Sequence, residues 1–124
     1  MVDLVKLRKM SAKVPLNIEA TQIDHLCKLA CNPKKRFERL EILWTFINLT
    51  CHSKEVPALF VREEVLYILW EIFQQAKSFG DMQTIDLWLA VYANLTRESK
   101  EIAAQLFPRL NVSDAILDLS LIHI

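Results

Sequence analysis

Glycine is almost missing from this sequence, which has one glycine among 124 residues. A chain with a single glycine has no glycine-rich loop to hold a phosphate group, and it is not collagen-like. An excess of one charge is also missing, because 15 basic residues balance 15 acidic ones. No overall field therefore favours nucleic acid or an anionic membrane as a partner. With an odd number of cysteines, three, a complete disulfide framework is not expected.

Long hydrophobic runs are missing too. No stretch reaches the roughly 18–20 apolar residues that a membrane-spanning helix needs, and the first 15 residues lack the apolar core of a signal peptide. We therefore expect an intracellular protein with reduced thiols. In that setting the three Asn-X-Ser/Thr triplets, which begin at Asn48, Asn94 and Asn111, are not expected to carry sugars.

Apolar residues are abundant, at 52% of the chain, and they recur every three or four positions almost throughout. This periodicity predicts an all-α protein. The helices are expected at about 18–31, 33–50, 55–62, 63–79, 82–97 and 99–106, with a last one beginning near Asn111. Gly80 is placed to end one helix and Asp81 to cap the next. Residues 1–15 are basic and weakly patterned, and no helix is predicted there.

One motif, a tryptophan followed by mostly apolar residues and then Asn-Leu-Thr, occurs twice in the sequence. We call each copy a repeated phrase. "WTFINLT" spans residues 44–50 and "WLAVYANLT" spans residues 88–96, each near the end of a long predicted helix. Each phrase is followed by a short predicted helix and then a longer one. The pattern is an internal repeat of about 40–47 residues, with one short and two longer helices in each unit, which is typical of HEAT and armadillo arrays.

The segment "ILWTFINLT", with Trp44 four residues before Asn48, resembles the third helix of armadillo repeats, within them the importin-alpha (karyopherin-alpha) branch. The resemblance covers most of residues 18–119. It implies a right-handed armadillo-type superhelical solenoid fragment. After the basic segment 1–15, residues 16–124 would form part of one repeat (about 16–54), a complete repeat (about 55–98) and part of a third (about 99–124).

The resemblance also implies a function, which is the binding of an extended basic nuclear localisation peptide. Trp44 would form a slot for the stem of a lysine or arginine. Asn48 and Asn94 would grip the peptide backbone, and Glu98 would supply the counter-charge. Importin-beta is a further partner that the resemblance implies, and the expected location is the cytoplasm and nucleus. The open ends of so short a solenoid favour self-association.

The sequence departs from the family at two positions of the predicted groove, because Ala90 stands where a second tryptophan is usual and His52 where an acid is usual. An armadillo-like interaction scaffold without cargo binding, as a short isoform or a diverged relative, is therefore kept as the alternative. Trp88, two residues before Ala90, falls on the other side of the helix and is expected in the core, as is Trp70.

The sequence gives weaker support for metal binding and for catalysis. Cys27, Cys31, Cys51 and the neighbouring histidines could form a small zinc site, but they stand in apolar helical segments where cysteine is a common core residue. Cys51 and His52 are the only candidate for a nucleophile with a base, and adjacent residues on a helix seldom face each other. We predict no enzyme activity, no metal and no cofactor.

Overall fold

We analysed a computed structural model of the chain, in which residues 3–13, 18–52 and 55–98 are described. All the regular structure in these ranges is helical, so the predicted all-α class is confirmed. The predicted helices from about 99 onward lie outside the described residues. The helices are α1 (Leu4–Lys13), α2 (Ala20–Ala30), α3 (Arg36–His52), α4 (Val56–Leu59), α5 (Glu63–Phe79) and α6 (Met82–Glu98).

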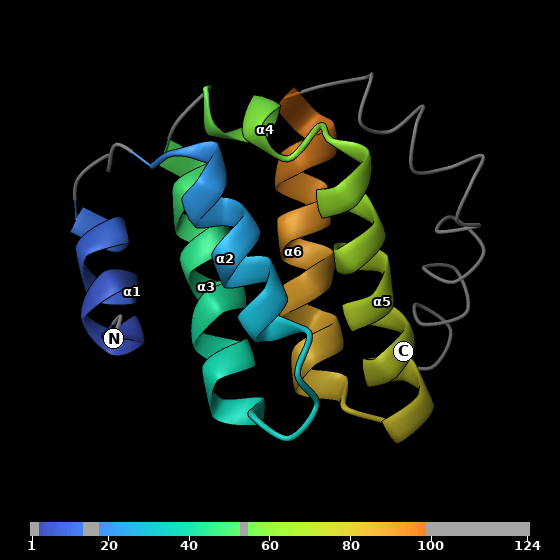
Figure 1. Ribbon diagram of the computed structural model, residues 1–124. Coiled ribbons are helices and arrows are strands. Elements are labelled where there is room, and N and C mark those ends of the chain that lie inside the picture. The colour runs from blue at the N-terminus through green and yellow to red at the C-terminus, as the bar shows by residue number, and fades with distance from the viewer. Residues whose placement is uncertain (1–2, 14–17, 53–54, 99–124) are drawn as a thin grey trace.

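The long helices form two layers (Figure 1). In the inner layer α1, α3 and α6 lie side by side, because α3 packs against both of its neighbours. In the outer layer α2 lies beside α5, and each also packs on the inner helix that follows it in the chain. The short α4 lies across one end and contacts α3 and α6. Two helix pairs, α2–α3 and α5–α6, are thus stacked with α1 added to the inner row.

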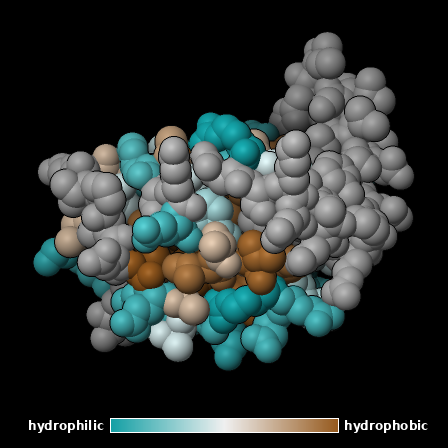
Figure 2. All heavy atoms as spheres, turned by 90° about the horizontal axis from the view of Figure 1, so that it is seen from above, coloured by the Kyte–Doolittle hydropathy of each residue, from teal (hydrophilic) through white to brown (hydrophobic). Residues whose placement is uncertain are grey.

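The core fills the space between the two layers. Seen from the end that carries α4, hydrophobic side chains gather in a band with hydrophilic ones on both sides (Figure 2). Burying an aliphatic or aromatic side chain of this size stabilises the fold by about 1.5–3 kcal/mol, so this cluster holds the layers together. Its largest fully buried members are Ile23, Ile42, Leu43, Phe46, Phe60, Ile72, Phe73, Ile85 and Leu95.

Two helix ends follow the predicted chemistry. Gly80 ends α5 with a φ of 66°, a left-handed conformation that glycine adopts without strain. The Asp81 carboxylate then caps α6, because it accepts hydrogen bonds from the Thr84 backbone N–H (3.3 Å) and hydroxyl (2.6 Å). The predicted start of α3 at residue 33 was wrong. Asn32 and Lys35 instead close a turn (3.2 Å), and the helix begins at Arg36.

Helix α1 was not predicted. Its Leu4 and Leu7 pack against the core of the neighbouring helices, and Ser11 is buried. Basic residues between these positions, such as Lys6 and Lys9, conceal the apolar spacing in the sequence. None of the described helices is long and apolar enough to cross a membrane.

Candidate functional site

A groove of about 440 Å³ runs along the inner layer. Two aromatic side chains of α3 stand out in its wall, because Trp44 is 48% exposed and Phe37 is 64% exposed. Large aromatic rings left in water at this level favour contact with another molecule. The groove is lined by Arg8 of α1, by Phe37, Leu40, Glu41 and Trp44 of α3, and by Gln83, Asp86 and Leu87 of α6.

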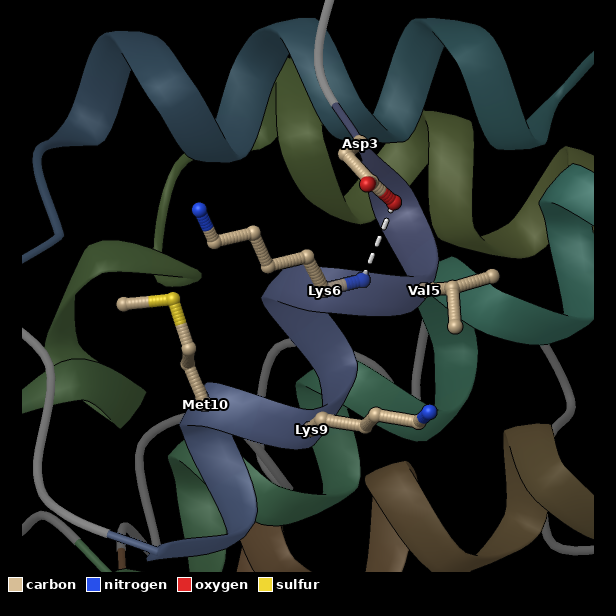
Figure 3. A pocket seen from close by; sticks show the side chains of 5 residues that line it. All are labelled: Asp3, Val5, Lys6, Lys9 and Met10. Carbon is tan, nitrogen blue, oxygen red and sulfur yellow. Dashed lines mark hydrogen bonds between the residues drawn. The ribbon is translucent and has the colours of Figure 1, made fainter.

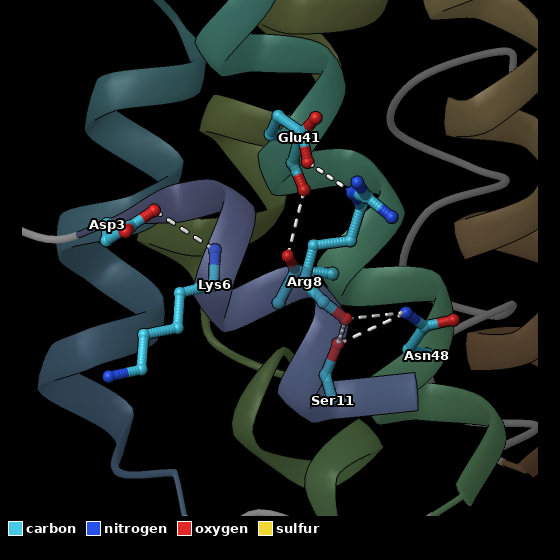
Figure 4. A network of polar contacts seen from close by, with 7 residues as sticks. Asp3, Lys6, Arg8, Ser11, Glu41 and Asn48 are labelled. Atoms are coloured by element: carbon cyan, nitrogen blue, oxygen red, sulfur yellow. Dashed lines mark hydrogen bonds and ion pairs between the residues drawn. The ribbon is translucent and has the colours of Figure 1, made fainter. Parts of the chain in front are cut away.

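The groove carries charge of both signs. Glu41 and Asp86 supply carboxylates from α3 and α6. The guanidinium of Arg8 forms an ion pair with Glu41, and both side chains remain partly exposed (Figure 4). A carboxylate beside an aromatic ring suits a cation with an apolar stem, since the ring contacts the stem and the carboxylate attracts the charge.

The tryptophans of the two repeated phrases lie in different environments. Trp88 is 3% exposed and its indole N–H donates to the Leu69 carbonyl oxygen at 2.7 Å. Its ring lies against Phe73 and Tyr92, with centroids 4.5 Å and 5.6 Å away. The expectation that Trp88 belongs to the core is confirmed. Trp70 is half-buried and packs against that core, stacked on Phe73.

Asn48 does not present its amide donor to the groove. Its Nδ2 donates to the backbone oxygen of Arg8 (3.3 Å) and to the hydroxyl of Ser11 (3.1 Å), both in α1 (Figure 4). The Ser11 hydroxyl itself donates to the Arg8 oxygen at 2.7 Å. The amide thus joins α3 to the last turns of the preceding inner helix.

Asn94 repeats this arrangement one helix further on. Its Nδ2 donates to the backbone oxygen of Ile47 (3.2 Å) and to the hydroxyl of Thr50 (3.1 Å), both in α3. Thr50 in turn donates to the Phe46 oxygen at 2.7 Å. We call this series the asparagine ladder: each asparagine of an inner helix donates to a carbonyl and a hydroxyl, three residues apart, in the inner helix before it.

The ladder accounts for the repeated Asn-Leu-Thr. Each asparagine reaches the previous inner helix, and Thr50, two residues after Asn48, accepts the hydrogen bond from Asn94 of the next one. From the sequence, both asparagines were predicted to bind a peptide ligand, and the hydroxyl acceptors were missed. The signal was present, since a hydroxyl residue follows each asparagine at the same distance, at Thr50 and Thr96.

The four predicted peptide-binding residues are therefore arranged differently from one another. Trp44 lines the groove, whereas Asn48 and Asn94 direct their amide donors at neighbouring helices. Glu98 is the last residue of α6, and its side chain lies outside the described part of the chain. The carboxylates that do line the groove, on Glu41 and Asp86, were missed.

Two of the three cysteines, Cys27 and Cys31, lie one turn apart at the end of α2. Burial raises the pKa of the Cys27 thiol to about 12, and burial also raises the pKa of Cys31. Cys27 is therefore a buried, protonated thiol at neutral pH. Cys51 is exposed at the other end of α3. Within the described ranges no three His, Cys, Asp or Glu residues are grouped to hold a metal ion.

The chain was compared with known protein families, with curated proteins and with solved structures, and none of them matches it.

Proposed function

We propose that this protein is a binding module of the right-handed armadillo type that holds an extended basic peptide, such as a nuclear localisation signal, in the groove along α3. The observation that carries the proposal is Trp44. This large aromatic side chain is half exposed in a groove that also contains the carboxylates of Glu41 and Asp86.

The proposed contacts follow from the lining of the groove. The aliphatic stem of a ligand lysine or arginine would lie on the Trp44 ring, with Leu40 and Leu87 completing an apolar surface. Its cationic head would approach Asp86 and Glu41, as a partly exposed ion pair with a cation–π component of about 0.5–1 kcal/mol. Glu41 already holds Arg8, so the incoming cation shares that carboxylate.

This arrangement changes the role of the asparagines. Their amide donors are used inside the protein, so we assign the selectivity of the groove to the ring and the carboxylates rather than to a clamp on the peptide backbone. A single cation site of this kind would bind weakly, because the gain from several linked sites is absent.

The test is fluorescence anisotropy of a labelled lysine-rich peptide titrated with the protein at low and at physiological salt. We expect binding that weakens with salt, because the exposed charges are screened. Trp44→Ala should raise the dissociation constant about tenfold by removing the stem contact and the cation–π attraction. A peptide with methionine in place of each lysine should lose binding although it keeps apolar stems.

Phe79→Ala is the matched control. Phe79 is also an exposed aromatic residue, but it does not line the groove. The control should bind the peptide as the wild type does. If a folded wild type binds no basic peptide, or if Phe79→Ala weakens binding as much as Trp44→Ala, the groove is not the site. An armadillo-like scaffold that binds another protein would then replace this proposal.

A further inference from the structure

The asparagine ladder defines which residues correspond along the inner layer. Arg8 and Ser11 accept from Asn48 in the same way as Ile47 and Thr50 accept from Asn94. This aligns the inner helices so that Lys9 occupies the position of Asn48 and of Asn94. In α3 and α6 that position reaches back to the preceding inner helix, so in α1 it marks a face suited to the same contact.

That face of α1 is exposed, unlike its counterpart in α3. Met10 is 43% exposed, whereas Leu49, at the corresponding position of α3, is 2% exposed. Figure 3 shows this surface: Lys6 and Met10 extend to one side of α1 and Lys9 to the other, around a shallow hollow of about 430 Å³. The described part of the chain thus presents here an exposed surface of α1 that carries two cations, Lys6 and Lys9, and the apolar side chain of Met10.

Within the described residues, the opposite end of the inner layer is α6, which carries the matching acceptors. The Ala93 oxygen and the Thr96 hydroxyl of α6 correspond to the acceptor pairs in α1 and α3, and this hydroxyl likewise donates back to its own helix, at 3.0 Å to the Tyr92 oxygen. Ser11 and Thr50 are each 1% exposed where an asparagine covers them. Thr96 is half-buried and Ala93 is exposed, so among the described residues this pair is less covered than its counterparts in α1 and α3.

We infer that a second copy of this chain docks head to tail, with its α1 placed on α6 as α3 is placed on α1. The Lys9 ammonium of one copy donates to the Ala93 oxygen and the Thr96 hydroxyl of the other, and Met10 packs between the helices. The groups are complementary in hydrogen bonding, because an ammonium group only donates hydrogen bonds and the carbonyl and hydroxyl oxygens can accept them. Such a contact joins two different faces, so it extends into open chains rather than closing as a dimer.

The experiment is sedimentation velocity of the full chain from low to high micromolar concentration. The wild type should show a sedimentation coefficient that rises steadily with concentration. Lys9→Glu places an anion against the carbonyl groups, and Ala93→Lys places a cation against Lys9. Each change should weaken association about tenfold or more, because like charges then meet at the contact.

Mixing the two variants separates this contact from others. In the mixture the unchanged α1 of the Ala93→Lys protein meets the unchanged α6 of the Lys9→Glu protein, so association should return. A contact between two identical α1 faces would leave Ala93→Lys as associated as the wild type, and that result would overturn the inference. A wild type that stays monomeric at all concentrations would overturn it as well.

Two controls keep the result specific. Lys28→Glu makes the same charge change at an exposed position of α2, and Ala58→Lys makes the other at an exposed position of α4. Both should associate as the wild type does. Circular dichroism and the unfolding temperature of every variant establish that it is folded. The groove residue Trp44 is unchanged throughout, so the outcome is independent of the proposed peptide binding.

Discussion

The helices α3 and α6 both contain Asn-Leu-Thr close to their ends, but their tryptophans lie in opposite environments. Trp44 stands four residues before its asparagine and is 48% exposed, whereas Trp88 stands six residues before its asparagine and is 3% exposed. Two positions along an α-helix turn a side chain by about 200°, nearly to the other side. The two tryptophans are therefore not equivalent, although a reading of the letters alone pairs them.

What is equivalent in the two helices is the hydrogen bonding. Asn48 and Asn94 each donate to a carbonyl and a hydroxyl of the preceding inner helix. These bonds satisfy polar groups where helices pack closely, and they fix the axial position of one helix against the next. The comparison separates an architectural part of the phrase, which repeats, from an exposed tryptophan, which occurs in one copy.

The largest effect should come from the buried tryptophan. Trp88→Ala removes a ring packed on Phe73 and Tyr92, and leaves the Leu69 oxygen without its indole donor. We expect a loss of about 3–5 kcal/mol in the free energy of unfolding, as for other large aromatic deletions in cores. Trp44→Ala removes a half-exposed ring and should cost about 1 kcal/mol or less. Urea denaturation followed by circular dichroism measures both.

The comparison fails if the two losses are similar. That result would mean that Trp44 supports the fold as much as Trp88 does, and its exposure in the groove would then say nothing about a ligand. The slope of the free energy against urea should be unchanged in both variants, because a change in slope reports an altered unfolded or native state rather than a lost contact.

Much of the helical architecture could be predicted from the sequence, because helix ends depend on residues that are close together in the chain. The helix bounded by Glu63 and Phe79 was predicted at both ends, because two acidic residues begin it and Gly80 follows it. The rotation of two residues around the helix, from Ala90 back to Trp88, also placed Trp88 in the core. Helix α1 was missed because its apolar positions are few and mixed with lysines, and α3 supplies the surface that makes it a helix.

The groove and the asparagine ladder were harder to predict, because they depend on which helices become neighbours in the fold. The donors of Asn48 and Asn94 find their partners about forty residues away in the chain. The pairing of Arg8 with Glu41 likewise joins α1 to α3. Periodicity within one helix shows which face is apolar, but it does not show which polar groups another helix will bring to that face.

A smaller effect should follow from breaking the ladder at each of its two steps. Asn94→Ala leaves the Thr50 hydroxyl and the Ile47 oxygen without this donor, which should lower the free energy of unfolding by about 1–2 kcal/mol. Asn48→Ala removes the same kind of bonds but joins only α1, which packs chiefly on α3. Its main result should be faster amide hydrogen exchange in α1, with a smaller global loss.

Hydrogen exchange followed residue by residue distinguishes the two steps. For the step between α6 and α3, Thr50→Val supplies a control, because it removes the hydroxyl that accepts from Asn94 and keeps the shape of the side chain. If Asn94 and Thr50 act together, the double variant should lose less than the sum of the single losses. Fully additive losses, or protection in α1 that is unchanged by Asn48→Ala, would contradict the ladder as a stabilising device.

The smallest effect should appear between α2 and α5 in the outer layer. These two helices are joined by an ion pair, whereas the inner helices are joined by neutral asparagine amides. Arg62, at the start of α5, forms two hydrogen bonds with Asp24 of α2, at 2.6 Å and 3.0 Å. The hydrogen bonds from Arg62 hold the pKa of the Asp24 carboxyl below its usual value of 3.8. The contribution is modest because both side chains are about one-third exposed to water.

The direction of the pH dependence follows from the lowered pKa of Asp24. A carboxyl that ionises more readily in the folded state stabilises the fold above its unfolded pKa, and this stabilisation is lost as the pH falls through the folded pKa. Asp24→Asn should therefore be less stable than the wild type at pH 7, and the difference should shrink as the pH falls below 3.8. The loss in Asn94→Ala should stay constant over the same range, because its bonds involve no titrating group. Thermal unfolding of the wild type, Asp24→Asn and Asn94→Ala across this pH range tests the contrast. If the difference in stability between Asp24→Asn and the wild type does not change with pH, the ion pair does not stabilise the contact between α2 and α5.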